Sequence, residues 1–118
     1  MPQYMLMLQE NPATFASVSP DDFQKIISEY RAWRLDLAGK GLLAGGAKLA
    51  DEGGRELTKP NGQVRVTDGP YAEAKEVMGG YFLIVAPDYD QAVSIASTCP
   101  HLKYGKIQVR QVDMLVEQ

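Results

Sequence analysis

The residues best suited to proton transfer in this sequence are its one histidine, His101, and Asp68. A carboxylate that accepts one ring N–H of a histidine fixes the tautomer and leaves the other nitrogen to exchange protons near neutral pH. Asp68 opens an Asp-Gly-Pro turn sequence, and His101 follows the expected end of a helix. Two interpretations stay open: a catalytic pair, or an aspartate that stabilises its own turn and a histidine placed where a helix C-terminus favours a cation.

Four further side chains are candidates for ligand binding. Tyr71 follows the turn and offers a ring with a hydroxyl, while Glu73 and Lys75 belong to a charged cluster directly after it. The alternative for that cluster is a solvated surface. Arg110 can pair with a carboxylate or phosphate of a ligand, and a structural ion pair, for example with Asp68, is the alternative.

Sequence motifs for cofactors and metals do not fit this chain. The stretch from Gly41 to Lys48 lacks the lysine position and the following Ser or Thr of a phosphate-binding loop, and Gly39-Lys40-Gly41 lacks the third glycine of a dinucleotide site. A catalytic zinc site takes three protein ligands, often several of them histidines, and this chain has only His101. No spacing of carboxylates indicates a site for another divalent cation. We therefore expect no metal and no bound cofactor.

Composition limits the class of protein further. A net charge of −3 with scattered basic residues argues against nucleic-acid binding, which needs clustered Lys and Arg. The single cysteine, Cys99, is expected to be a buried structural thiol and indicates a reducing compartment, so we expect a cytoplasmic protein. No run of about 18 apolar residues and no secretory leader is present, so we expect neither a membrane span nor export.

Two helices are predicted from capping residues and apolar periodicity. The first begins at Ser19, an N-cap serine followed by proline and two acids, and ends near Gly39. The second begins at Asp88 or Asp90 and ends before Pro100.

Five strands are predicted, at residues 3–9, 42–50, 64–67, 81–85 and 106–116. The first and fourth are apolar on both faces, which is typical of central strands covered on both sides. At 64–67 Val64 and Val66 alternate with polar residues, which predicts a half-buried strand. Gly45-Gly46 indicates a bulge or a close backbone approach, and a change of apolar parity predicts a bulge near Arg110-Gln111. Residues 51–62 are polar and rich in turn formers, which indicates a loop or a long hairpin.

This order of elements predicts one α+β domain over residues 1–118, a ferredoxin-like βαββαβ fold with an inserted middle loop. Two helices cover only one face of such a sheet, yet its central strands are apolar on both faces. The simplest cover for the second face is another copy of the same sheet about a two-fold axis. We therefore expect a homodimer.

The sequence VTDGPYAEAKE at 66–76 and GGYFLI at 79–84 closely resemble the signature of the DGPF group within the YCII-related family. Residues 99–101 and 105–112 are similar to the closing segment of that group, so the likeness covers nearly the whole chain. Tyr71 replaces the usual Phe, Gln108 replaces a common acid, and Gln111 replaces a common proline. The resemblance implies a ferredoxin-like fold, a dimer of the α/β-barrel style, and a site in a cleft between the sheet and the partner.

A catalytic His–Asp pair is proposed in the wider family, but its histidine falls near residues 17–21, where this chain has none. We therefore expect a small-molecule enzyme or binding protein with an acid–base site in a dimer cleft, formed by Asp68 and His101 and lined by Tyr71. The resemblance also implies an alternative, a non-catalytic accessory protein that binds a metabolite or a protein partner, since DGPF-like proteins are associated with sigma-factor-dependent transcription. The sequence does not identify the ligand.

Overall fold

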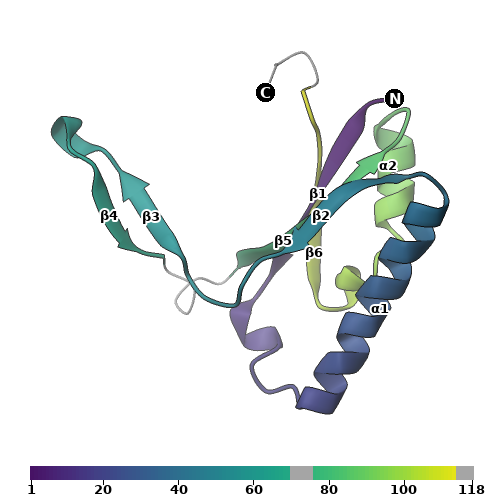
Figure 1. The fold of residues 1–118 in the computed structure, drawn as a ribbon, viewed down its shortest axis with the longest axis horizontal. Coiled ribbons are helices and arrows are strands. Elements are labelled where there is room, and N and C mark those ends of the chain that lie inside the picture. Colours follow the sequence, from purple (N-terminus) through teal and green to yellow (C-terminus); the bar gives the residue numbers. More distant parts are fainter. Residues whose placement is uncertain (70–75, 114–118) are drawn as a thin grey trace.

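The computed structural model describes residues 1–69 and 76–113, and in these residues it has six strands and two α-helices (Figure 1). In chain order they are β1 (Gln3–Glu10), α1 (Pro20–Gly39), β2 (Leu43–Lys48), β3 (Arg55–Thr58), β4 (Arg65–Asp68), β5 (Val77–Val85), α2 (Tyr89–Ala96) and β6 (Gly105–Gln111). Short 3-10 turns lie at Pro12–Thr14, Pro60–Gly62 and Pro100–Lys103.

Four of the strands form one antiparallel sheet in the order β2-β5-β1-β6. With α1 between β1 and β2 and α2 between β5 and β6, this is the ferredoxin-like α+β fold that the element order predicted. The strands expected to be central, now β1 and β5, do occupy the two central positions. They pair from Gln3 with Val85 to Glu10 with Val77.

Both helices begin where the capping residues predicted. The Ser19 hydroxyl accepts a hydrogen bond from the backbone N–H of Asp22 at 3.2 Å, and the Asp88 carboxylate accepts one from Gln91 at 2.9 Å. These side chains satisfy backbone donors that a helix start leaves without a partner. Helix α1 ends at Gly39, as expected.

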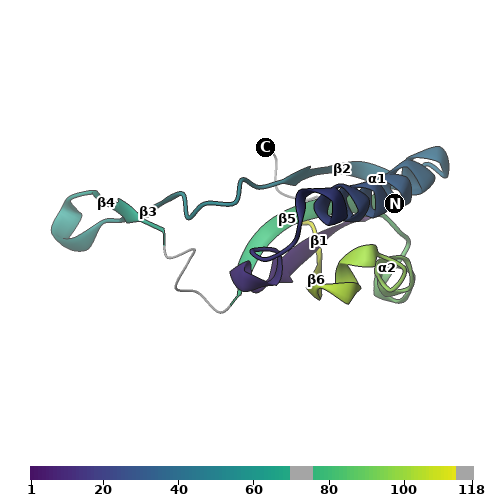
Figure 2. The same cartoon turned by 90° about the horizontal axis from the view of Figure 1, so that it is seen from below.

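The core lies between the helices and one face of the sheet. Side chains at alternate positions of β1 point into it, and their neighbours on β5 and residues of both helices complete it: Tyr4, Leu6, Leu8, Leu37, Phe82, Ile84, Ala86, Ala92, Ala96 and Cys99. The intervening residues of the central strands, Met5, Met7, Tyr81 and Leu83, lie on the other face and are partly exposed. Figure 2, together with Figure 1, shows α1 and α2 on the same side of the sheet. We call the other side the helix-free face.

Strands β3 and β4 form a separate two-stranded hairpin that extends away from the helices (Figures 1 and 2). The strand predicted at 64–67 is confirmed as β4, but its predicted half-burial was wrong, because all eight residues of β3 and β4 are exposed. Val64 and Val66 do alternate with polar residues, but no other element within residues 1–69 and 76–113 covers the apolar side of the hairpin. Of the two alternatives for residues 51–62, a loop or a long hairpin, the structure shows the hairpin. Its first strand, β3, lies within this range, and its second, β4, follows Gly62.

The two predicted irregularities have different outcomes. The pairing of β2 with β5 shifts register between Leu43 and Gly45, as the glycines indicated. The bulge expected near Arg110-Gln111 is absent, because β6 pairs with β1 without interruption as far as Gln111. Val112 continues this alignment by donating its N–H to the carbonyl of Gln3 at 2.8 Å.

Among the described residues, neither helix combines the length and the apolar character needed to cross a membrane.

Candidate functional site

A cavity of about 330 Å³ lies between α1 and the sheet, at the end of the molecule where β1 ends and β5 begins. Such a volume is within the range of small-molecule sites. Its walls come from β1, α1, β2 and β5 and from the turn after β1, and most of them are apolar. The apolar side chains are Leu8, Phe15, Phe23, Ile26, Ile27 and Phe82.

Two glycines leave the space that this cavity needs. A Cβ added to Gly46 would lie 2.8 Å from the carbonyl oxygen of Tyr81 and 2.9 Å from the Cδ1 atom of Phe82. A Cβ added to Gly79 would collide with the carboxylate of Glu10. Both glycines line the cavity, so side chains there would displace the groups that shape it.

Glu10 is the carboxylate that enters this cavity from the sheet. It ends β1 in phase with the buried residues Leu6 and Leu8, and it is half-buried. Burial raises the pKa of its carboxyl above the ordinary value, and the charge of Asp51 raises it further, while Lys48 partly opposes both effects. Glu10 is therefore protonated more readily than a carboxyl in water, and a shift in this direction strengthens a carboxylate as a base.

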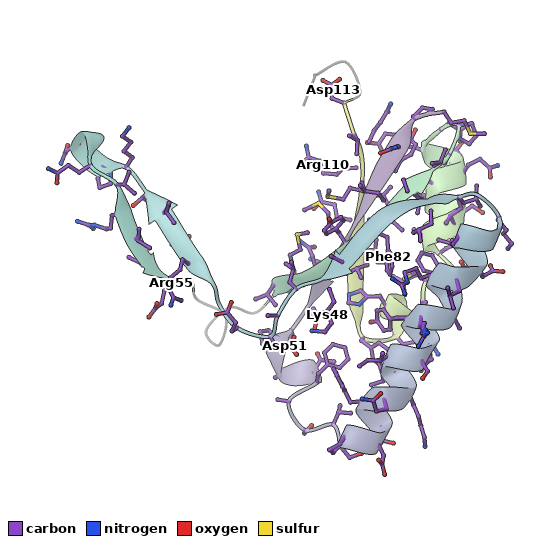
Figure 3. The ribbon with its side chains drawn as sticks, viewed as in Figure 1. Lys48, Asp51, Arg55, Phe82, Arg110 and Asp113 are labelled. Carbon is purple, nitrogen blue, oxygen red and sulfur yellow. The ribbon has the colours of Figure 1, made fainter. Side chains whose placement is uncertain are left out.

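Lys48 and Asp51 form an ion pair beside Glu10, with Nζ 2.8 Å from Oδ1 (Figure 3). Both line the cavity, and both side chains are more than half exposed. Lys48 is the last residue of β2 and Asp51 follows it, and Figure 3 shows both where the chain leaves the sheet for the hairpin. An exposed pair of this kind contributes little to stability, so its groups are available to a ligand at small cost.

Tyr30 and His101 form a buried polar chain that ends on the backbone. The Nε2 atom of His101 lies 2.9 Å from the carbonyl oxygen of Gln9, and its Nδ1 lies 2.7 Å from the Tyr30 hydroxyl. A carbonyl can only accept, so Nε2 carries the ring proton and the neutral ring accepts from Tyr30 at Nδ1. The Tyr30 oxygen keeps lone pairs, and Tyr30 lines the cavity.

Burial favours the uncharged forms of His101 and Tyr30. It lowers the pKa of His101, and the carbonyl of Gln9 opposes that effect only in part. It also raises the pKa of Tyr30 well above the ordinary phenol value. His101 is among the residues that line the cavity, but it is only 1% exposed and both of its ring nitrogens are engaged, so its ring acts by orienting Tyr30.

Two arginines of α1 also line the cavity. Arg31 and Arg34 are exposed, and in residues 1–69 and 76–113 no ion pair involves either of them. A guanidinium group binds a carboxylate or phosphate through two parallel hydrogen bonds. These side chains give the cavity an anion-binding side next to its apolar walls.

The two residues expected to act as a pair are not brought together within the chain. Both ring nitrogens of His101 are occupied by Tyr30 and Gln9. Asp68 ends β4 on the projecting hairpin, where its carboxylate lies 3.4 Å from the Arg55 guanidinium and is 90% exposed. The following Gly69 donates its N–H to Gly54 at 3.1 Å, so this part of the turn sequence closes the base of the hairpin.

The candidate ligand-binding residues lie away from this cavity or outside the described residues. Arg110 is on β6 opposite Met5, on the helix-free face, and Figure 3 shows it on the other side of the sheet from Phe82. Tyr71, Glu73 and Lys75 fall in 70–75, outside the described residues.

Sequence reasoning missed Glu10 and Tyr30 as site residues. A signal for Glu10 was present, since a carboxylate continues the alternation of Tyr4, Leu6 and Leu8 that the core buries. Tyr30 recurs at helical spacing with the apolar residues of α1, and nothing local marks its hydroxyl as the partner of a histidine 71 residues later.

Metal and thiol chemistry find no support in the geometry of the described residues. Their His, Cys, Asp and Glu side chains form no group of three or more that could hold a metal ion. Cys99 is buried, as expected, and burial raises the pKa of its thiol. A protonated thiol is a poor nucleophile.

The fold and the cavity define an α+β ferredoxin-like protein with a mostly apolar cavity between α1 and the sheet. A family model, the YCII-related domain, matches residues 2–115, nearly the whole chain. The protein therefore belongs to the YCII-related family. A search of curated proteins finds no match to this chain.

Proposed function

We propose that the protein binds a small molecule with an apolar body and an anionic group in the cavity between α1 and the sheet, and that Glu10 exchanges a proton with it. The observation that carries this proposal is a half-buried carboxyl with a raised pKa inside an apolar cavity whose lining includes Arg31 and Arg34. Perturbed carboxyl groups in apolar cavities with a few convergent polar groups are typical of active and binding sites.

The chemistry assigned to each group follows from its surroundings. Glu10 serves as the proton acceptor, since burial raises the pKa of its carboxyl and so makes its carboxylate a stronger base than one in water. Tyr30 accepts a hydrogen bond from the ligand while its own proton points to His101. The arginines pair with the anionic group and hold the apolar body against Phe23 and Phe82.

This proposal keeps the expected acid–base chemistry and changes its location. The proposed site lies on the helix side of one chain and uses Glu10 in place of Asp68. The Asp-Gly-Pro-Tyr sequence at 68–71 supports membership of the DGPF group within the family. The homodimer, likewise a proposal, is supported by the partly exposed Met5, Met7, Tyr81 and Leu83 on the helix-free face.

A pair of probes that differ only in charge tests the ligand class. The probes are 3-phenylpropionate and 3-phenylpropanol, titrated into isotope-labelled protein and followed by NMR. Ligands of this size contribute about 0.3 kcal/mol per heavy atom or somewhat more, so affinities in the millimolar range are expected. We expect the acid to bind at least about fivefold more tightly than the alcohol, the effect of an exposed ion pair worth about 1 kcal/mol.

The control separates the cavity from the rest of the surface. Replacing Arg31 and Arg34 together by Gln removes two cations from the cavity, while Arg110→Gln removes one from the helix-free face. Loss of the preference for the acid only in the Arg31/Arg34 variant supports the proposal. Equal affinities for the two probes in the wild type, or loss of the preference in Arg110→Gln, contradicts it.

A further inference from the structure

One face of the hairpin formed by β3 and β4 is polar, and the other is apolar from the tip as far as the Arg55–Asp68 pair at its base. Leu57 pairs with Val66, so their side chains lie on the same face of the ribbon, and Val64 lies two residues before Val66. These three side chains are 63%, 57% and 60% exposed, in that order. The other face carries Glu56, Thr58, Arg65 and Thr67. We call Leu57, Val64 and Val66 the apolar face of the hairpin.

An isolated hairpin of this kind lacks the packing that two-stranded sheets need. Two strands alone are at best marginally stable in water, and they require further strands or a packed surface. Within the described residues β3 and β4 pair only with each other, and every one of their side chains is exposed. The apolar face of the hairpin therefore has a surface to bury, and the described residues of its own chain do not cover it.

The chain exposes more surface than a compact monomer of its size. The chain exposes 8142 Å², whereas a compact monomer of 13.0 kDa exposes about 6,300 Å². Its radius of gyration is 16.3 Å, against about 13.5 Å for a compact domain of 118 residues. The excess area of about 1,800 Å² exceeds the 800 Å² or so that each partner buries in a standard interface.

The position of the hairpin indicates which partner fits. It projects on the side of the sheet opposite the helices, the side on which the helix-free face also lies (Figure 1). That face carries a second partly apolar surface around Met5, Met7 and Leu83. In a two-fold association each copy presents the same surfaces to the other, so one partner covers the hairpin and the helix-free face together.

We propose that the apolar face of the hairpin is an interaction surface for a second copy of this chain, and that two protomers exchange their hairpins. Each hairpin crosses to the partner and packs Leu57, Val64 and Val66 against it. The Arg55–Asp68 ion pair, 3.4 Å apart, closes the base of the hairpin where it leaves its own protomer. The Asp-Gly sequence thereby acquires a structural role in assembly, independent of the ligand site.

Lysines introduced on either face of the hairpin test this proposal. Leu57→Lys with Val66→Lys places two cations on the apolar face, and the matched control, Thr58→Lys with Thr67→Lys, places two on the polar face. All four residues are exposed in the protomer, so both variants should fold. Sedimentation equilibrium gives the dimer dissociation constant, and far-UV circular dichroism verifies the fold.

We expect a wild-type dimer whose dissociation constant rises at least about 100-fold in the apolar-face variant and by less than about threefold in the control. Amide hydrogen exchange adds a second readout, since the β3 and β4 amides should lose protection on dilution below that dissociation constant. A wild-type chain that stays monomeric at about 100 μM overturns the proposal. Its dimer dissociation constant would then be weaker than that of a stable interface of standard size. Equal dissociation constants for the two variants overturn it as well.

Discussion

Removing the Tyr30 hydroxyl should leave a buried histidine nitrogen without a donor. In Tyr30→Phe the ring of residue 30 stays in place, but Nδ1 of His101 loses the hydrogen bond of 2.7 Å, and His101 is 1% exposed. The ring cannot recover by changing tautomer, because Nε2 must keep its proton for the carbonyl of Gln9. A buried acceptor without a partner costs about 1–3 kcal/mol.

The matched control is Tyr104→Phe. The Tyr104 hydroxyl donates to Glu29 at 3.2 Å, and Glu29 keeps its ion pair with Lys103 when that hydroxyl is removed. We therefore expect the control to cost no more than about 0.5–1 kcal/mol. Urea unfolding at about pH 8, where free histidine is neutral, gives both free energies from the midpoint and the slope. A loss in Tyr30→Phe no larger than that in the control would refute the assigned hydrogen-bond chain.

Three further predictions concern pH, cavity shape and thiol reactivity. Because burial lowers the pKa of His101, the unfolded chain binds a proton below about pH 6.5 more readily than the folded chain does. The free energy of unfolding should therefore fall below that pH by up to about 1.4 kcal/mol per pH unit. Urea titrations of His101→Gln should lack this slope. Gly46→Ala should destabilise by about 1–3 kcal/mol in thermal unfolding, since its Cβ would lie 2.8 Å from a backbone oxygen, whereas Gly45→Ala, with 3.7 Å to Leu83, should be tolerated; equal effects would contradict the close approach. Cys99, 3% exposed, should react with a thiol reagent in urea and only slowly in the native state, and rapid native labelling would contradict its burial.

The fold could be predicted from the sequence because each element has a local signal. Ser19 and Asp88 mark the helix starts through their own side chains, and the two-sided apolar strands 3–9 and 81–85 identify the centre of the sheet. Central position follows from composition, since only a strand with cover on both faces gains from apolar residues on both.

Features that depend on contacts between distant segments could not be predicted in the same way. The alternation at 64–67 predicted a half-buried strand. Alternation shows that one side of a strand is apolar but does not say what covers that side, and the described residues of this chain do not cover it. The parity change near Arg110 predicted a bulge, yet the pairing of β6 with β1 is continuous to Gln111. Parity reports burial of side chains, and at the end of an edge strand burial is weak on both faces.

In the candidate site, too, local features could be predicted and contacts between distant residues could not. His101 was identified because it is the only histidine, but its partner was not, since Asp68 and Tyr30 are 33 and 71 residues away from it and neither spacing favours contact. Glu10 stands one residue beyond the predicted strand 3–9, so its place on the buried face depended on where that strand ends. Strand ends are the least certain part of such a prediction, and here one residue decides whether a carboxylate enters the cavity.

The most direct test of the proposed site is to locate a bound probe by intermolecular nuclear Overhauser effects. With 3-phenylpropionate, the account predicts contacts from the ring protons of the probe to the methyl groups of Ile26 and Ile27, which line the cavity. The methyl groups of Met5 and Met7 report on the helix-free face of the same sheet. Contacts to those methionines, with none to the isoleucines, would contradict a ligand site between α1 and the sheet.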